Sequence, residues 1–255
     1  MQNRFLSAVA VVIFAVAGTV HASDTACPQF FQGQQAPDLI DTSLAERTTV
    51  VCNDAYALIA SGVTKGPLWS AEHLTATQIA NAKNTPRTDA FHPETAIPAE
   101  DRSQLADYKG SGYDRGHMTP SGDEPNATAQ RQSFSLANMV PQDHLLNTGK
   151  WERIETSLRT MVTNDGEAWV VTGPAFDGPT PSTIGADAVI VPNYTWKAVY
   201  IPAEGGAAVW RCSNVDATVC TVMSVKAITD ETGIDPFPAL SAAVKQKAIS
   251  LPLPN

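Results

Sequence analysis

Residues 113–117 read Tyr-Asp-Arg-Gly-His, and thirty residues after His117 the chain reads Asn147-Thr-Gly-Lys-Trp-Glu-Arg-Ile-Glu155. Together these two segments supply the groups that phosphodiester hydrolysis requires. The imidazole of His117 is neutral near pH 7 and can take a proton from water. Asn147 offers a hard amide oxygen of the kind that suits Mg²⁺. Arg115 and Arg153 carry forked donors that match phosphate oxygens.

The second segment begins the most regular helical pattern in the chain. Apolar residues recur at spacings of three, four and three, at Trp151, Ile154, Leu158 and Met161. This stripe predicts a helix that packs against a sheet. Extended back by four residues, the stripe reaches Asn147, so an amide stands where the pattern asks for an apolar residue. Glu155 lies eight residues further on, about 12 Å along an α-helix, and shares the inner shell of a metal only if the helix bends.

Breaks and alternation predict the other elements. We predict a strand or hairpin at residues 48–59, a strand edge and then a short helix at 70–81, a loop at 84–98, a short strand at 113–118, strands at 168–172, 188–191 and 196–201, and a helix at 222–232 that ends at Gly233. No internal repeat or linker divides the chain, so we predict a single domain over residues 23–255.

The first 22 residues have the pattern of an export signal. Arg4 is followed by an uncharged apolar run over residues 5–18, and Val20-His21-Ala22 ends it with a small residue. We predict cleavage after Ala22, giving a periplasmic or secreted protein with no membrane attachment. An uncleaved anchor is the alternative, although the run is short for a membrane span.

Four cysteines agree with an oxidising compartment, because they form an even set without the C-x-x-C spacing of zinc or redox sites. Four cysteines allow three pairings. The simplest joins Cys27 to Cys52 and Cys212 to Cys220.

The charge balance does not indicate a tight binder of polyanions. The chain has 17 basic and 26 acidic residues and a formal net charge of −9, which is not the basic surface typical of nucleic-acid binders. Even residues 81–159, which hold both motif segments, carry nine basic and eleven acidic side chains. A bound Mg²⁺ would bring its own charge to a phosphate, so the chemistry is not excluded.

The two segments and their surroundings resemble the DNA/RNA non-specific endonuclease family of ββα-metal nucleases. The ordered blocks that match are Pro67-Leu68-Trp69, Arg87, Asp114-Arg115-Gly116-His117, residues 134–142, Asn147 with Glu155, and Val170-Val171-Thr172-Gly173-Pro174. The resemblance covers roughly residues 50–240. It implies an α+β fold in which a central antiparallel β-sheet is flanked by helices and carries a ββα-metal (His-Me finger) active site.

The resemblance also implies roles for single residues. His117 would be the general base, Asn147 the metal ligand, and Arg87 and Arg115 the groups that stabilise the phosphate in the transition state. The other residues implied near the site are Glu155 as a catalytic residue and Asp114, Asn138 and Arg159 as supporting residues.

For several of these residues a purely structural role is the alternative. Asn147 could be a helix N-cap, Arg115 could pair with Asp114 or another acidic residue, and Glu155 could form a surface ion pair with Arg159 at i, i+4.

The expected function is that of an exported endonuclease that requires Mg²⁺, with Mn²⁺ as a substitute, and cuts both DNA and RNA. Two other functions fit the same residues. One is a phosphodiesterase or phosphatase for small phosphate esters, and the other is a catalytically silent nucleic-acid-binding relative. The sequence leaves the oligomeric state open between a monomer and a homodimer.

Overall fold

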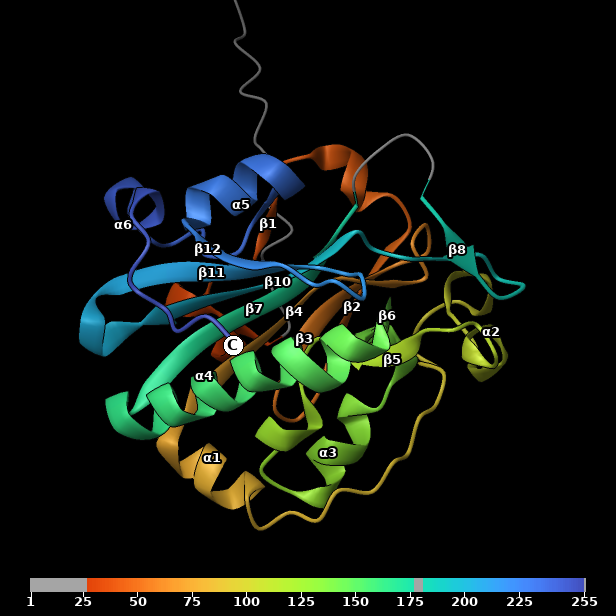
Figure 1. Ribbon diagram of the computed structural model, residues 1–255, viewed down its shortest axis with the longest axis horizontal. Helices are drawn as coiled ribbons and strands as arrows, with labels where there is room; N and C mark the ends of the chain where they lie inside the picture. Colours follow the sequence, from red (N-terminus) through yellow and green to blue (C-terminus); the bar gives the residue numbers. More distant parts are fainter. Residues whose placement is uncertain (1–26, 177–180, 255) are drawn as a thin grey trace, which may run out of the picture.

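A seven-stranded antiparallel sheet forms the centre of the computed structural model, which describes residues 27–176 and 181–254. The export signal expected at residues 1–22 lies outside the described residues. The strand order is β12-β11-β10-β7-β4-β3-β2 (Figure 1). The strands of this sheet are β2 (Thr48–Cys52), β3 (Ala57–Ser61), β4 (Gly66–Thr75), β7 (Glu167–Ala175), β10 (Tyr194–Ile201), β11 (Gly206–Ser213) and β12 (Cys220–Met223).

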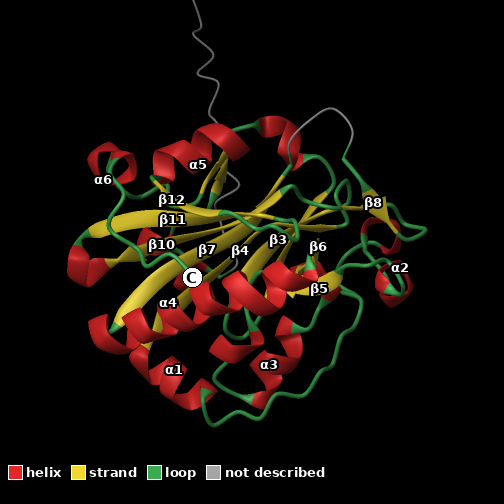
Figure 2. Cartoon of the chain, in the orientation of Figure 1, coloured by secondary structure: helices red, strands yellow, loops and turns green. Residues whose placement is uncertain are grey.

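Helices cover both faces of the sheet (Figure 2). The helices are α1 (Ala76–Ala82), α2 (Leu105–Tyr108), α3 (Ala127–Ser133), α4 (Glu152–Asp165), α5 (Val225–Thr232) and α6 (Ala242–Gln246). Three two-stranded ribbons complete the fold: β1 (Asp38–Leu39) with β13 (Ile234–Asp235), β5 (Asp114–His117) with β6 (Met139–Gln142), and β8 (Thr183–Ile184) with β9 (Val189–Ile190).

The two faces of the sheet have separate hydrophobic cores, as the alternation of side chains along a strand requires. In β10, Trp196 and Ala198 belong to the core under α5, together with Val225 and Ile228. Val199 and Ile201 face the other way. They pack with the buried residues of α4, which are Ile154, Leu158 and Val162.

All of the predicted site residues lie in one segment of the sequence, which joins two strands that are neighbours in the sheet. β4 pairs with β7 from Ser70–Thr172 to Thr75–Glu167, yet residues 76–166 separate them in sequence. This excursion contains α1, α2, β5, α3, β6 and α4. α4 then returns the chain across the sheet to β7. The predicted ββα unit is present as β5, β6 and the helix that follows them.

The structure confirms much of the predicted pattern and corrects parts of it. Residues 48–59 enter the β2–β3 hairpin, and 84–98 contain no helix and no strand of the sheet. The strand before α1 is not at an edge, because β4 lies between β3 and β7. Residues 188–191 contribute to the small β8–β9 ribbon and not to the sheet. The helix expected from residue 222 begins at Val225, because Ser224 caps it and β12 ends at Met223.

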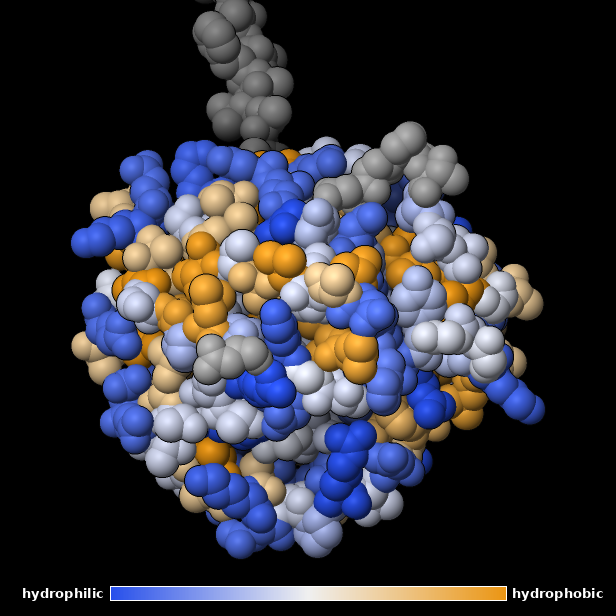
Figure 3. Space-filling view, in the orientation of Figure 1, coloured by the Kyte–Doolittle hydropathy of each residue, from blue (hydrophilic) through white to orange (hydrophobic). Residues whose placement is uncertain are grey.

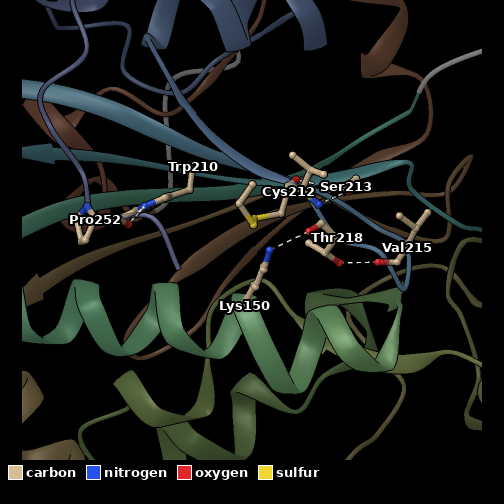
Figure 4. The surroundings of a disulfide bond; sticks show 9 residues. Lys150, Trp210, Cys212, Ser213, Val215, Thr218 and Pro252 are labelled. Carbon is tan, nitrogen blue, oxygen red and sulfur yellow. Dashed lines mark hydrogen bonds between the residues drawn. A yellow bond between two sulfur atoms is a disulfide. The ribbon is translucent and has the colours of Figure 1, made fainter. Parts of the chain in front are cut away.

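Both expected disulfides are present, Cys27–Cys52 and Cys212–Cys220, and the described residues include no free cysteine. The first ties the start of the described chain to β2. The second closes the β11–β12 hairpin, whose surroundings are drawn in Figure 4.

The surface shown in Figure 3 mixes hydrophilic and hydrophobic residues, with orange atoms scattered among blue ones. Among the described residues, no helix has the length and apolar character that crossing a membrane would need.

Candidate active site

A cleft of about 850 Å³ opens at the end of the β5–β6 ribbon, and the two predicted motif segments meet there. In the view of Figure 1, α4 and α2 lie on either side of β5. We call one side the α4 wall, which consists of Asn147, Glu152, Glu155 and Arg159. The other side is the α2 wall, which consists of Phe91, Leu105, Tyr108, Lys109 and Tyr113. His117, Arg87 and Arg115 also line the cleft.

A π-helical turn over Leu146–Trp151 precedes α4 and presents Asn147 to the cleft. Its wider turn places Leu146 and Trp151, five residues apart, in the same core. The four-residue extension of the apolar stripe was therefore wrong at this end: Leu146 takes the buried position, and Asn147 is turned toward the cleft. At the other end Val162 is the buried residue, and Met161 is only partly buried.

The same π-helical turn brings Asn147 and Glu155 to one wall. In an uninterrupted α-helix, eight residues would leave the two side chains about 80° apart around the axis. Here both line the cleft. Asn147 is not an N-cap, since it lies inside the π-helical turn.

The carboxylate of Asp114 orients the amide of Asn147. Asn147 Nδ2 donates to Asp114 Oδ2 at 2.8 Å, and His144 Nδ1 lies 2.9 Å from the same oxygen. Asn147 Oδ1 has no hydrogen-bond donor among residues 27–176 and 181–254 and remains available as a ligand. Asp114 therefore has a positioning contact, and His144 adds to it.

His117 lies at the end of β5 in an apolar environment. Its ring is edge-on to the ring of Phe134, with centroids 4.9 Å apart, and is tilted against the ring of Phe91, with centroids 5.9 Å apart. Burial, which is the largest cause, and the neighbouring Arg87 and Arg115 together lower the pKa of His117 to about 3, against the opposing effect of Asp89. Its Nε2 has no partner in the described part of the chain. The imidazole is thus neutral and able to accept a proton.

The position before His117 requires glycine because the neighbouring strand lies close to it. A Cβ at this position would overlap the side chain of Gln142 on the paired strand β6. Because Gln142 is fully buried, it has little room to move. Glycine allows the two strands to approach and so sets the position of His117.

The two arginines are held differently. The guanidinium of Arg115 stacks over Phe91, with Cζ 4.0 Å from the ring centroid, and it does not form the alternative ion pair with Asp114. Arg87 donates to Asp89 at 2.8 Å and to Ser121 at 3.1 Å. Both line the cleft with His117, where their charge can meet a phosphate.

Asp123 anchors Arg159, the last residue of the α4 wall. Its Nη1 donates to Asp123 Oδ1 at 2.9 Å, and Asp123 is only 1% exposed. The alternative ion pair between Glu155 and Arg159 is not among the ion pairs of the described residues. Burial raises the pKa of Glu155 to about 7, against the opposing effect of Lys197 and Arg159.

Two buried polar side chains hold the backbone just after His117. Asn138 accepts from Thr119 N through Oδ1 and donates through Nδ2 to the carbonyls of Thr119 and Ser133. Lys197 on β10 donates to Met118 O and to Thr172 Oγ1. Asn138 therefore satisfies backbone groups and, in doing so, supports the strand that carries His117.

The hairpin closed by Cys212–Cys220 supports the π-helical turn from the side of the sheet. Lys150 reaches up from the turn and donates to Thr218 O at 3.0 Å (Figure 4). Asn214 donates to Pro141 O at 2.9 Å and accepts from Asp143 N at 2.7 Å. Both ends of the segment that carries Asn147 thus contact this one hairpin.

The donor set fits a hydrated hard cation. Asn147 Oδ1 is available, and the carboxylate of Glu155 lies on the same wall. No group of three or more His, Cys, Asp or Glu side chains in residues 27–176 and 181–254 could hold a metal ion. An ion such as Mg²⁺, which keeps several of its own waters, is compatible with one amide ligand and an outer carboxylate.

Sequence reasoning missed Asp123, Lys197 and Phe134. Lys197 gave the only usable signal, because it is a charged residue at an inward position of an apolar strand. Phe134 begins the matched block 134–142, but no role was assigned to it, and it packs against His117. Asp123 contacts Arg159 from 36 residues away and stands in no recognisable pattern.

Comparison with known proteins identifies the family of the chain. Residues 38–243 match the family model described as DNA/RNA non-specific endonuclease. The chain is 31% identical to human mitochondrial nuclease EXOG over 78% of this chain and 60% of that protein. Over 59% of this chain and 44% of the relative, it is 34% identical to mitochondrial nuclease EXOG of Xenopus laevis. It is 35% identical to nuclease C1 of Cunninghamella echinulata var. echinulata over 52% of this chain and 58% of that protein.

The chain thus spans between 44% and 60% of the length of these relatives. The solved structure of the EndoG/EndoGI complex is similar in fold, with a TM-score of 0.68 and 24% identity over 76% of this chain and 88% of that one. Since the family model covers most of the chain, this protein belongs to the DNA/RNA non-specific endonuclease family.

Proposed function

We propose that this protein is an exported, Mg²⁺-dependent endonuclease that hydrolyses phosphodiester bonds of DNA and RNA. The observation that carries the proposal is the pairing, in one cleft, of the neutral His117 with an Asn147 amide that Asp114 has oriented. A base and a cation ligand are the two parts that phosphodiester hydrolysis needs first.

In this mechanism His117 takes the proton of the attacking water. Arg87 and Arg115 bind the phosphate oxygens and stabilise the charge that grows in the transition state. Asn147 would hold the Mg²⁺, and Glu155 would accept hydrogen bonds from its waters. When bound, the cation supplies Lewis-acid stabilisation of the phosphate and of the leaving oxygen. Asp114 and Asn138 position these groups without reacting.

The test is plasmid nicking with Mg²⁺, with Mn²⁺ and with chelator. Cleavage should need the metal, and His117→Ala should lower kcat by about 10²–10⁴-fold, the range for a lost general base. His73→Gln is the matched control, because His73 stacks on Trp169 at the opposite face of the sheet. Near-normal cleavage by a folded His117→Ala protein would overturn the assignment.

A second candidate function is hydrolysis of small phosphate esters, which the net charge of −9 favours. Turnover of a small diester would then exceed plasmid cleavage by the same protein, with both activities lost in His117→Ala. A protein that binds nucleic acid but cleaves neither substrate would be the silent relative, although the presence of His117, Asn147 and Glu155 together speaks against it.

We also propose that residues 1–22 direct export and are then removed. The two disulfides support an oxidising destination. Intact mass of protein recovered from the periplasm or medium should correspond to a chain that begins at Ser23. A mass that includes residues 1–22 would contradict cleavage.

A further inference from the structure

The cleft extends past the catalytic groups along the α2 wall. A volume of about 850 Å³ is more than one phosphate group needs, and Leu105, Lys109 and Tyr113 line it together with His117. Leu105 is 41% exposed, one of the larger apolar side chains left in contact with solvent. The wall is apolar and basic, and it contains no acidic side chain among its five residues.

Leu105 is presented by a helix that is firmly held. Gln104 N donates to Asp107 Oδ2 at 2.7 Å, which closes a capping box at the start of α2. Asp107 Oδ1 also accepts from Asp187 N at 3.1 Å. Tyr108 is buried in a core with Leu136 and Met139. The exposure of Leu105 is therefore a property of a fixed surface and not of a loose loop.

The aromatic part of the wall is also fixed. Phe91 packs edge-on against Phe134, with ring centroids 4.8 Å apart and planes at 89°. Arg115 covers one face of Phe91 at 4.0 Å. Because His117 lies 5.9 Å from the same ring, this surface starts beside the residue that faces the scissile phosphate. Lys109, which follows α2 directly, lines the same cleft and adds a cation to this wall.

We propose that the α2 wall is a stacking subsite for a nucleobase of an unpaired strand, next to the scissile phosphate. This inference rests on the proposed nuclease function. Flat aromatic and apolar surfaces between basic side chains bind single strands without reading sequence, because every base has a face that can stack. In a duplex these faces are covered by neighbouring bases. The subsite therefore favours single-stranded over duplex substrate.

The charge of the chain supports the same conclusion. With 17 basic and 26 acidic residues, few phosphates can be neutralised by lysine and arginine. Stacking offers affinity that does not depend on counterion release. A base stacked on the α2 wall would supply part of the binding affinity that a basic surface supplies in other nucleic-acid-binding proteins.

The experiment compares two oligomers of equal length and charge, oligo(dT) and its fully abasic analogue, as substrates with Mg²⁺. For the wild-type protein, KM should be about tenfold lower for oligo(dT), within the range for loss of one stacked base. Leu105→Ala should remove most of this ratio by raising KM for oligo(dT) alone. Leu105→Trp should increase the ratio, because it enlarges the stacking surface.

Leu253→Ala is the matched control, because Leu253 is 53% exposed and does not line the cleft. Thermal melting checks that each variant is folded. Equal KM values for the two oligomers, or equal changes in both with Leu105→Ala, would overturn the stacking subsite. If neither oligomer were cleaved, the proposed function itself would fail, which is a different result from cleavage of both at equal KM.

Discussion

The two walls of the cleft hold their side chains by different means. On the α4 wall, polar contacts orient two of the four side chains: Asp114 holds the amide of Asn147, and Asp123 holds Arg159. On the α2 wall, packing holds the aromatic side chains: Phe91 lies against Phe134, and α2 is buried through Tyr108. His117 lies between the two walls and contacts the rings of Phe91 and Phe134.

The difference follows from what each wall would bind. A metal ligand must direct one oxygen at one point, so its second amide atom needs a partner that fixes the orientation. A stacked base needs only a flat surface at the correct distance from the phosphate, and packing alone can provide that surface. Variants of the two walls should therefore fail in different ways.

The largest effect is expected from Asn147→Ala on the α4 wall. Loss of the amide ligand should lower kcat on the order of 10³-fold at fixed Mg²⁺, since a bound cation contributes several kcal/mol to the transition state. Mn²⁺ binding, followed by electron paramagnetic resonance or calorimetry, should weaken in parallel. Thr160→Ala, further along α4, is the control. Unchanged Mn²⁺ binding would show that the ion sits elsewhere, and the comparison of the walls would then break down.

The next effect concerns stability. Arg159→Met should lower the free energy of unfolding by about 3 kcal/mol, because it leaves the carboxylate of Asp123 buried without its partner. Lys226→Met removes an exposed i, i+4 pair with Asp230 and should cost less than about 1 kcal/mol. Urea unfolding measures both. Addition of Asp123→Asn should recover part of the loss, and failure to do so would mean that the ion pair is not the cause.

The smallest effect is on the pH dependence of the free energy of unfolding, to which His117 contributes because it is buried against aromatic rings. The folded pKa is lowered to about 3, whereas the unfolded value is about 6.5. Above pH 6.5 both states are neutral. Between these values only the unfolded chain binds the proton, so stability should fall as pH falls, by about 1.4 kcal/mol per pH unit.

His117→Gln should remove this contribution. Urea midpoints at pH 7, 6 and 5 should therefore decline less steeply in the variant than in the wild-type protein. Parallel curves for the two proteins would indicate that the histidine is solvated, and that the aromatic rings do not shield it.

Local signals predicted the strand at residues 113–118 and the helix after Asn147, whereas their assembly into a ββα unit was expected only from the family resemblance. Glycines before residue 113, a charged strand and an amphipathic helix are each visible within short windows. β11 was not predicted, since Gly206, Ala207 and Ala208 have weak strand preference. Its position follows from pairing with β10 along its whole length, which is a tertiary effect.

Within the site, the residue types could be predicted better than their orientation. Extrapolation of an α-helical spacing placed Asn147 on the buried face, and the π-helical turn reverses that result. The ion pair of Arg159 with Asp123 joins residues 36 apart in the chain, and Lys197 meets Met118 across 79. No periodicity in the sequence reports contacts of that range.

The hairpin closed by Cys212–Cys220 connects the redox state of two thiols to the segment that carries Asn147. While the disulfide is formed, the carbonyl of Thr218 and the side chain of Asn214 are offered to the π-helical turn from a covalently closed loop. When it is reduced, the same contacts depend on hydrogen bonds alone. Formation of this one covalent bond, between residues outside the cleft, should therefore make the segment that carries Asn147 more rigid.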